Sequence, residues 1–403
     1  MAGLDSILSL DDFEHAARRH MPGPVFAYVS GGCETDASLR DNRNVFREYG
    51  FVNRVLAGVS NRSAATALFG RTWAAPFGIA PMGITALSAY RGDLVLAQAA
   101  GAANVPFVLS GSSLIRMEEV ARANPQAWFQ AYVPGEPERI IGLVDRVQAA
   151  GFGTLMVTVD TTVSANRENN IRAGFSTPLR PSLRLAWEGV THPRWTLGTF
   201  IRTWIKHGMP HFENSYATRG APILARNVLR DFGARDHLNW DHMDLIRKRW
   251  PGKLVIKGLM SSADARTARA CGFDGIIVSN HGGRQLDGTV SPLRVLPGIV
   301  EAAGDLPVMM DSGIRRGTDV LKALACGARF VFVGRPFNYA AAVGGEPGVR
   351  HAINILAEEV HRDMGLLGIN TLAEMTPERL LRIAPPSPSG CRSRRPARDR
   401  PAR

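Results

Sequence analysis

Five charged side chains of this chain have the types and settings that proton transfer on a small anion requires. His281 directly follows a short apolar run and precedes two glycines, which allow close approach of the backbone. Asp160 and Lys257 lie at the ends of two other such runs. An aspartate can orient the imidazole of a histidine and stabilise its protonated form, as a general base needs. Asp160 and His281 are therefore a candidate acid–base couple.

Arg167 and Arg284 complete the five. Guanidinium groups form paired hydrogen bonds with a carboxylate, so two of them in one site predict recognition of a carboxylate substrate. A buried cation such as Lys257 would stabilise negative charge that develops on a neighbouring cofactor. The alternative interpretation is a network of salt bridges that closes one end of the fold, and the residue types leave it open.

Two glycine-rich segments predict a phosphate site. Residues 311–317 (DSGIRRG) hold Gly313, Arg315 and Gly317, and residues 334–337 (GRPF) hold Gly334 and Arg335. Backbone amides in such turns and at helix N-termini bind phosphate, and arginine adds fixed donors. Either segment alone would favour a plain tight turn. Together, at the two strand ends where barrels bind phosphate, they favour a phosphorylated ligand.

The elements that would position these residues are eight short runs rich in Val, Ile and Phe. They span residues 76–82, 105–111, 127–133, 153–160, 253–258, 275–280, 307–313 and 329–335. The runs do not alternate apolar with polar residues, so each is expected to be buried on both faces, as strands of a parallel sheet are. Amphipathic Ala-rich segments separate most of them, at 93–103, 136–150, 262–271 and 317–326. Eight such repeats predict a closed (β/α)8 TIM barrel, with an open doubly wound sheet as the alternative.

Polar residues gather at the carboxyl ends of these runs, where such barrels hold their active sites. Three segments lie outside the repeat. Residues 1–75 predict a helical extension over the barrel, and residues 161–237 form a long insertion after the fourth strand. Residues 385–403 predict a disordered tail rich in Pro and Arg. We therefore predict one domain, 1–384, with 161–237 as an insertion or lid, and a basic tail after it.

The net charge of +12 invites a nucleic-acid partner, but its distribution argues against one. The last 19 residues carry six Arg and one Asp, and no aromatic side chain among them could stack on bases. The four cysteines show no CxxC pair, and no motif predicts a metal site. The first residues do not read as a signal peptide, and no run is long enough to span a membrane, so a cytoplasmic location is expected.

Residues 279–287 (SNHGGRQLD) resemble the signature of the FMN-dependent L-2-hydroxy acid dehydrogenases and oxidases. This family includes glycolate oxidase, L-lactate dehydrogenase and L-mandelate dehydrogenase. The resemblance extends over residues 5–384. It implies the barrel fold, FMN as the cofactor, and oxidation of an L-2-hydroxy acid to a 2-keto acid.

The resemblance also implies a role for each matching residue. His281 is the base and Asp160 its partner, and Lys257 lies beside the flavin. Arg167 and Arg284 bind the substrate carboxylate together with Tyr28 and Tyr132, and Tyr132 belongs to the catalytic set as well. The residues expected to hold FMN are Ala80, Pro81, Met82, Gly83, Ser110, Gln130, Thr158, Lys257, Ser279, Asp311, Gly313, Arg315, Gly334 and Arg335.

The electron acceptor is expected to be a quinone or oxygen. Gly83 stands where oxidases of the family tend to carry Ala, which favours a dehydrogenase. Residues 180–220 hold Trp187, Trp195 and Trp204 among basic residues, which suits a membrane interface. Parts of this stretch resemble membrane-associated lactate and mandelate dehydrogenases, so peripheral attachment to the cytoplasmic face of the inner membrane is a further expectation. The other interpretation of the insertion is a lid that packs between subunits.

The family resemblance implies a homo-oligomer, a tetramer. Three other functions are alternatives. An oxidase of the family would pass its electrons to oxygen and make hydrogen peroxide. Another kind of FMN barrel, such as an isomerase, would not need the paired arginines with the His–Asp couple. A non-catalytic basic binding protein would leave the whole set of residues unexplained.

Overall fold

Eight parallel strands form a barrel in a computed structural model of the chain, which describes residues 3–176, 182–225 and 235–383. Each strand lies within one of the eight predicted runs, except that β8 extends one residue beyond the run 253–258. They are β4 (Phe77–Ile79), β5 (Val108–Ser110), β6 (Trp128–Tyr132), β7 (Thr154–Thr158), β8 (Lys253–Leu259), β9 (Gly275–Val278), β10 (Val308–Met310) and β11 (Phe330–Val333). Neighbours in sequence pair in order, and β11 pairs with β4. A parallel bridge between Ile79 and Phe107 joins β4 to β5, so the predicted (β/α)8 barrel is confirmed.

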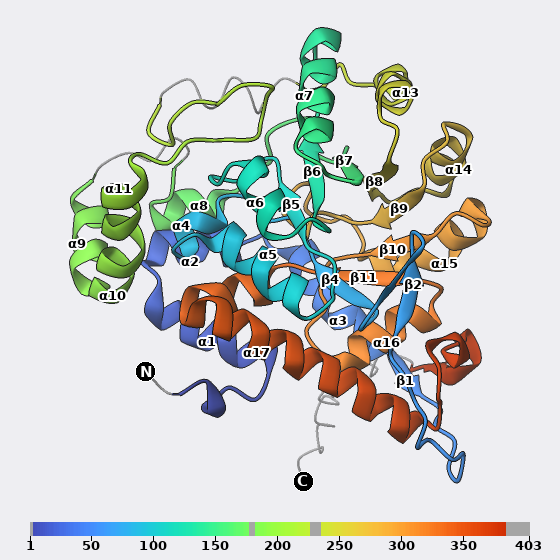
Figure 1. The fold of residues 1–403 in the computed structure, drawn as a ribbon. Helices are drawn as coiled ribbons and strands as arrows, with labels where there is room; N and C mark the ends of the chain where they lie inside the picture. Colours follow the sequence, from blue (N-terminus) through green and yellow to red (C-terminus); the bar gives the residue numbers. More distant parts are fainter. Residues whose placement is uncertain (1–2, 177–181, 226–234, 384–403) are drawn as a thin grey trace, which may run out of the picture.

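Helices surround this barrel (Figure 1), because the strands are buried along nearly their whole length and need cover on their outer face. All four predicted helical segments are present, with ends shifted by a residue. The helices are α4 (Thr85–Ser88), α5 (Gly92–Ala102), α6 (Met117–Ala123), α7 (Pro137–Ala149), α13 (Trp240–Arg249), α14 (Ser262–Ala270), α15 (Pro292–Ala303), α16 (Gly317–Ala325) and α17 (Arg335–Leu367), the last broken at Gly345.

The amino-terminal extension contributes α1 (Leu10–His20), α2 (Gly23–Ser30) and α3 (Ala37–Asn44), as predicted. It also forms two small sheets that the sequence did not predict. The hairpin of β2 (Thr66–Leu68) and β3 (Arg71–Trp73) closes the amino-terminal end of the barrel, where Trp73 packs among interior side chains of the barrel strands. The strand β1 (Tyr49–Phe51) pairs with β12 (Leu380–Arg382).

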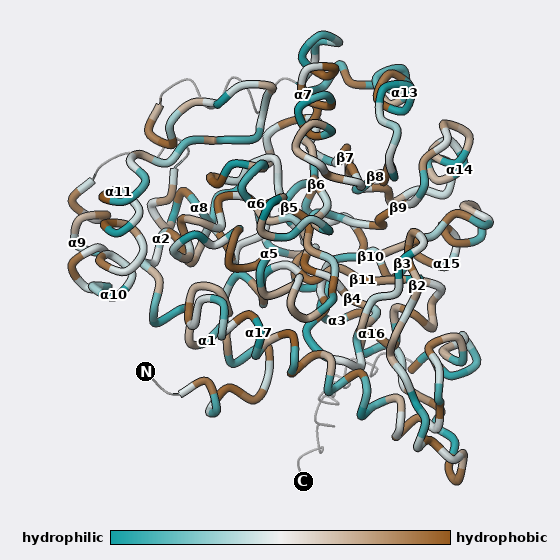
Figure 2. Tube along the Cα trace, in the orientation of Figure 1, coloured by the Kyte–Doolittle hydropathy of each residue, from teal (hydrophilic) through white to brown (hydrophobic). Residues whose placement is uncertain are grey.

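The insertion after β7 forms a group of short helices at one side of the barrel (Figure 1). They are α8 (Glu168–Ala173), α9 (Leu183–Thr191), α10 (Pro193–Trp195), the π-helix η3 (Thr196–Ile201) and α11 (Arg202–His207). Figure 2 shows apolar residues on these helices although they lie at the edge of the molecule. Across the described ranges, no helix has the length and apolar character needed to cross a bilayer. The predicted tail, 385–403, falls outside the described residues.

Candidate functional site

A cavity of about 690 Å³ opens at the carboxyl ends of the barrel strands. Sixteen of the twenty predicted site residues line it: Tyr28, Ala80, Pro81, Met82, Gly83, Tyr132, Thr158, Arg167, Lys257, His281, Arg284, Asp311, Gly313, Arg315, Gly334 and Arg335. The other four are Ser110, Gln130, Asp160 and Ser279. Asp160 and Ser279 are hydrogen-bonded to His281 and Lys257, and Ser110 and Gln130 are hydrogen-bonded to each other on the neighbouring strands β5 and β6. The structure therefore brings the predicted set together around one cavity.

Strand register explains why distant residues meet here. Tyr132 of β6 is paired with Thr158 of β7, which is paired with Lys257 of β8. Register-paired residues of parallel strands project to the same side of a sheet, so these three side chains form one row at the rim of the barrel. Ser110 and Gln130 form a second row two residues closer to the strand starts.

His281 is held in one orientation. Its Nδ1 lies 2.9 Å from Oδ1 of Asp160, so Nδ1 carries the proton in this contact and Nε2 is left as the acceptor. Nε2 lies 3.5 Å from the hydroxyl of Tyr132 on the cavity side. Asp160 packs directly against the backbone of Gly258. Only glycine fits at that position, since φ is +110° and a Cβ there would lie 2.7 Å from the Cβ of Asp160.

The electrostatics of this couple favour a neutral imidazole. Burial lowers the pKa of His281 below its usual value, and Lys257 and Arg167 lower it further, while Asp160 acts in the opposite direction. Burial by itself would raise the pKa of Asp160, but His281 and Lys257 hold that pKa below its usual value. A neutral imidazole beside an ionised carboxylate is the state in which His281 can take up a proton.

Lys257 is a buried cation at the barrel rim. Its Nζ donates to Oγ of Ser279 at 2.9 Å and lies 3.1 Å from Oδ2 of Asp311. Burial opposes the charge, but Asp311 and Asp160 outweigh it, so the pKa of Lys257 is raised above its usual value. The ammonium group therefore stays charged next to the cavity.

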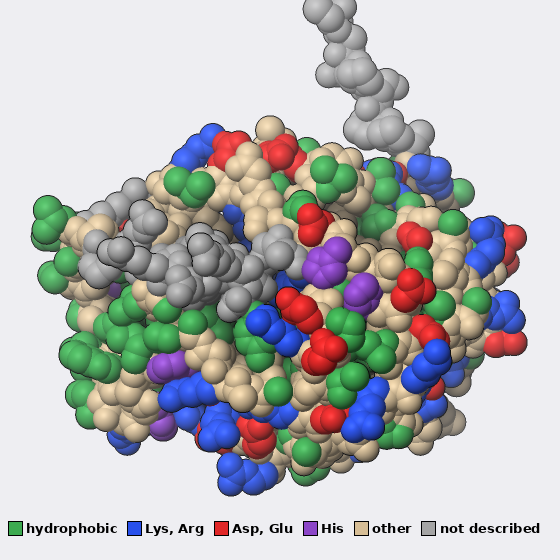
Figure 3. All heavy atoms as spheres, turned by 90° about the horizontal axis from the view of Figure 1, so that it is seen from above, with side chains coloured by type: hydrophobic (Ala, Val, Ile, Leu, Met, Phe, Trp, Pro, Cys, Tyr) green, Lys and Arg blue, Asp and Glu red, His purple; other side chains and the backbone are tan. Residues whose placement is uncertain are grey.

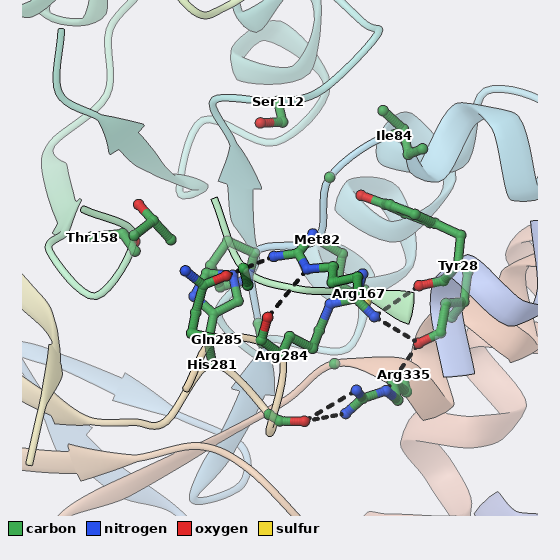
Figure 4. A pocket seen from close by; sticks show the side chains of 18 of the residues that line it. Tyr28, Met82, Ile84, Ser112, Thr158, Arg167, His281, Arg284, Gln285 and Arg335 are labelled. Carbon is green, nitrogen blue, oxygen red and sulfur yellow. Dashed lines mark hydrogen bonds between the residues drawn. The ribbon is translucent and has the colours of Figure 1, made fainter. Parts of the chain in front are cut away.

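Arg167 and Arg284 adjoin one another on the wall of the cavity (Figure 4). Arg284 donates from Nη1 to the carbonyls of Tyr28 and Gly31, both at 2.7 Å, and its guanidinium lies 5.0 Å from the centre of the Tyr28 ring. Arg167 donates to Oε1 of Gln285 at 2.7 Å. Burial and the nearby charge of Arg167 lower the pKa of Arg284 to about 9. Two crowded cations fit a site whose ligand is an anion, since its charge relieves their repulsion.

The predicted phosphate segments line the same cavity, where Arg335 shares the carbonyl acceptor of Gly31 with Arg284. The amides of Arg315 and Arg316 donate to Asp319, and that of Gly317 donates to Glu359, so the first turn of α16 is already capped by carboxylates. Arg335 donates to the carbonyls of Val29, Gly31 and Gly282 and keeps its side chain at the cavity wall. A phosphate here would therefore rest on the turn at Gly313 and on the start of α17 more than on the N-terminus of α16.

Several polar atoms are placed as the expected flavin requires. Among the described residues, Nε2 of Gln130 and Oγ1 of Thr158 are buried without a hydrogen-bond partner. Buried donors of this kind are costly unless a ligand satisfies them. They lie in the two register rows that also hold Ser110 and Lys257, so donors and a cation gather on neighbouring strands beside the cavity. This set fits the polar edge of an isoalloxazine ring.

Some functional neighbours escaped the sequence prediction. Gln285 links Arg167 to the backbone carbonyl of Asp160, and its place within the signature could have indicated it. The amides of Asn42 and Asn280 exchange two hydrogen bonds of 2.8 Å and fix the loop of His281 to α3. Arg235 packs over the ring of Tyr132 with 4.9 Å between its guanidinium and the ring centre. It lies in the insertion, where no sequence pattern singled it out.

Comparisons with known proteins agree with this geometry. The model of a protein family described as FMN-dependent dehydrogenase matches residues 17–382. An L-lactate dehydrogenase of Xanthomonas euvesicatoria is 38% identical over 382 residues, which cover 94% of this chain and 97% of the relative. An (S)-mandelate dehydrogenase of Pseudomonas putida is 35% identical over 376 residues, which cover 93% and 94%.

Solved structures show the same likeness in three dimensions. A monotopic membrane protein, (S)-mandelate dehydrogenase, aligns with a TM-score of 0.85 at 35% identity and covers 93% of this chain and 99% of its own. A mandelate oxidase aligns with a TM-score of 0.76 at 33% identity and covers 93% and 98%. The similarity therefore includes proteins described as dehydrogenases and one described as an oxidase.

Proposed function

The chain belongs to the family of FMN-dependent dehydrogenases, and we propose that it oxidises a small L-2-hydroxy acid of the L-lactate or L-mandelate type to the 2-keto acid. The observation that carries this proposal is the meeting of the His281–Asp160 couple and the Arg167–Arg284 pair in one cavity. A base and a carboxylate-binding pair together suit a hydroxy acid whose reacting carbon is next to its carboxylate.

In this proposal the substrate carboxylate binds Arg167 and Arg284, with Tyr28 beside them. The substrate hydroxyl then lies towards Tyr132 and Nε2 of His281, the two groups that face each other at 3.5 Å. His281 receives one proton, from the carbon in a carbanion mechanism or from the hydroxyl in a hydride mechanism. Asp160 stabilises the imidazolium that results.

FMN supplies the acceptor for the two electrons that leave the substrate. Gln130, Thr158 and Ser110 would hold its polar ring edge, and the cation of Lys257 would offset negative charge on the reduced ring. Gly313, Arg315, Gly334 and Arg335 would hold the ribityl phosphate end. The apolar side chains of Ile84, Val163 and Phe175 also line the cavity, which suits a substrate with an apolar side chain.

The first test is the visible spectrum of the purified protein under anaerobic conditions. We expect a flavin spectrum that bleaches with L-lactate or L-mandelate and not with the D-enantiomer. A protein that stays colourless after FMN has been supplied would contradict the proposal, and so would a flavin that no L-2-hydroxy acid reduces.

We propose that a quinone accepts the electrons and that the inserted helices attach to a membrane surface. Trp187 and Trp204 are 67% and 56% exposed, together with Leu183, Val190, Leu197 and Ile205 on the same group of helices. A structurally similar relative is described as a monotopic membrane protein. Admitting oxygen after anaerobic reduction separates this proposal from the oxidase alternative, since slow return of the flavin spectrum is expected here and rapid return with hydrogen peroxide would favour an oxidase.

One detail of the predicted membrane interface is wrong. Trp195 does not face solvent: it is only 6% exposed, and its Nε1 donates to the carbonyl of Leu87 at 2.9 Å. It anchors the inserted helices to the barrel while Trp187 and Trp204 face outward. Two of the basic residues in the predicted patch 180–220 are Arg180 and Arg184, and Arg180 and the side chain of Arg184 lie outside the described part of the chain. The tetramer and the cytoplasmic-face location stay part of this proposal, and the mass of the purified protein in solution tests the former.

A further inference from the structure

A second hollow, of about 520 Å³, lies between α1 and the turn that joins α9 to α10. Its basic lining comes from both elements: His15, Arg19 and His20 of α1, with His192 and Arg194 of the insertion. We call these five residues the basic groove. It shares no lining residue with the catalytic cavity.

The carboxylates near the basic groove are engaged elsewhere. Asp12 lines it, but Oδ2 of Asp12 accepts the amides of Leu8 and Ser9 at the start of α1. Glu188 lies 3.6 Å from Nδ1 of His192, and the same carboxylate accepts the amide of Gly23 at 2.8 Å. Within the described part of the chain, neither Arg19 nor Arg194 has a carboxylate within ion-pair distance. Arg19 and Arg194 together outweigh the single carboxylate of Asp12 in the lining, so the lining has a net positive charge.

Crowding of this charge is visible at His20. Burial lowers the pKa of His20, and the neighbouring Arg194 and His192 lower it further. Basic groups from two separate elements thus converge in the groove. Bringing an anion into the groove would remove that repulsion.

The basic groove adjoins the exposed apolar side chains of the inserted helices. The turn that supplies His192 and Arg194 begins where α9 ends, and α9 exposes Leu183, Trp187 and Val190 at four- and three-residue spacing on one face. Figure 3 shows hydrophobic side chains gathered at this edge of the molecule. An occupant matched to both surfaces has an anionic head and apolar chains.

We propose that the basic groove binds the phosphate group of an anionic phospholipid whose acyl chains lie against the exposed face of the inserted helices. The inference rests on the membrane contact proposed above and adds a specific lipid class and a specific seat for it. A free phosphate ion would match the charge of the groove but not its apolar border.

The experiment compares binding of the flavin-loaded full chain to vesicles of phosphatidylcholine alone and to vesicles that also contain phosphatidylglycerol. The test variant is Arg19→Gln/Arg194→Gln. Its matched control is Arg266→Gln/Arg329→Gln, which removes the same charge from exposed positions on α14 and just before β11, away from the inserted helices (Figure 1). We expect the wild-type chain to bind the vesicles with phosphatidylglycerol more tightly than those without it. The affinity for the anionic vesicles should fall by about 30-fold in the test variant and stay unchanged in the control.

A second readout reports on the groove itself. The NMR titration of His20, assigned with a His20→Gln variant, is followed with soluble short-chain phosphatidylglycerol and, separately, with inorganic phosphate. We expect the lipid to raise the pKa of His20, since a bound anion stabilises the imidazolium. Inorganic phosphate should raise the pKa of His20 only at a much higher concentration than the lipid. Equal effects of the two would overturn the assignment to a lipid.

The outcomes separate the two proposals. The proposed lipid site in the basic groove is overturned if vesicle binding does not depend on phosphatidylglycerol, or if it is unchanged in Arg19→Gln/Arg194→Gln. The membrane contact would then still stand. A shift in the pKa of His20 without binding to any vesicle overturns the membrane contact, and with it the assignment of the groove to a lipid of the membrane surface. Absence of both overturns both.

Discussion

His281 combines a catalytic side chain with an uncommon backbone. It has φ +57°, and Gly282 and Gly283 follow at +67° and +74°, so three residues in a row adopt the left-handed region. A Cβ at Gly282 would lie 2.8 Å from Nη1 of Arg335, and one at Gly283 would lie 2.6 Å from the backbone of Leu39. The two glycines after the histidine are therefore required by close packing, and the turn they make aims His281 at Asp160.

The role of His281 as the base is tested by His281→Asn. Asparagine tolerates the left-handed backbone better than other residues, so the loop and the flavin should be retained. We expect kcat/KM to fall by about 10²- to 10⁴-fold, the usual contribution of a general base. The measurement is steady-state kinetics with the flavin content checked by its spectrum. Near-normal activity with bound flavin would exclude His281 as the base.

The His281–Asp160 couple also predicts a pH dependence. His281 must be neutral to accept a proton, so kcat/KM should fall as the pH drops through the pKa of His281, which burial holds below its usual value. In Asp160→Asn the carboxylate that raises this pKa is gone. We therefore expect the acid limb of the profile to move to lower pH while the plateau falls. An acid limb that stays in place or moves to higher pH would show that the couple does not control the titration.

At the scale of elements, α5 supports the loops that form one wall of the cavity. Asp93 in its first turn is 1% exposed, and it lies against the segments of Thr85, Ala86 and Ser113. These segments follow β4 and β5, and they continue into Gly83 and Ser112 at the cavity. A buried carboxyl thus sits behind the part of the site that the sequence assigned to flavin binding.

Burial raises the pKa of Asp93 from 3.8 to about 6, although Thr85, Ser113 and the amide of Ala86 oppose the shift. The folded state therefore holds this proton more tightly than the unfolded state, and the stability it contributes below pH 3.8 is lost as the pH rises through about 6. We expect Asp93→Asn to gain thermal stability relative to wild type as the pH rises through this window. The melting temperature against pH measures it, with Asp264→Asn in the exposed first turn of α14 as the control. A difference that does not change with pH would contradict the assignment.

At the scale of the whole molecule, the two ends of the described chain are tied together. The strands β1 and β12 pair, the amide of Ile383 donates to the carbonyl of Glu48 at 2.7 Å, and α1 packs on α17. Glu48 in turn joins Asp41 around Arg294 of α15. The extension is thus part of the barrel assembly, and it carries Tyr28 to the cavity.

This arrangement predicts different outcomes for two truncations. A chain that ends after Ile383 lacks the residues predicted as a disordered tail, and we expect its flavin content and its unfolding in urea to equal those of the full chain. A chain that ends after Arg379 also lacks β12 and its ladder with β1, so we expect its free energy of unfolding to fall by about 1–3 kcal/mol, at about 1 kcal/mol for each lost hydrogen bond. Equal stability of the two truncated chains would contradict a structural role for β12.

The sequence by itself predicted the barrel, and its resemblance to a known family predicted most of the residues that the structure places around the cavity. Strands buried on both faces are apolar throughout, so the eight runs could be recognised from short stretches of sequence. The polar residues that end these runs lie at the same end of the barrel, so they too could be predicted from the sequence. Only the tertiary structure decided what depends on distant partners: that β1 pairs with β12, that Trp195 turns inward while Trp187 stays exposed, and that Asp319 and Glu359 already cap α16. Residues far apart in the chain determine these features, and no local pattern records which partner a surface will meet.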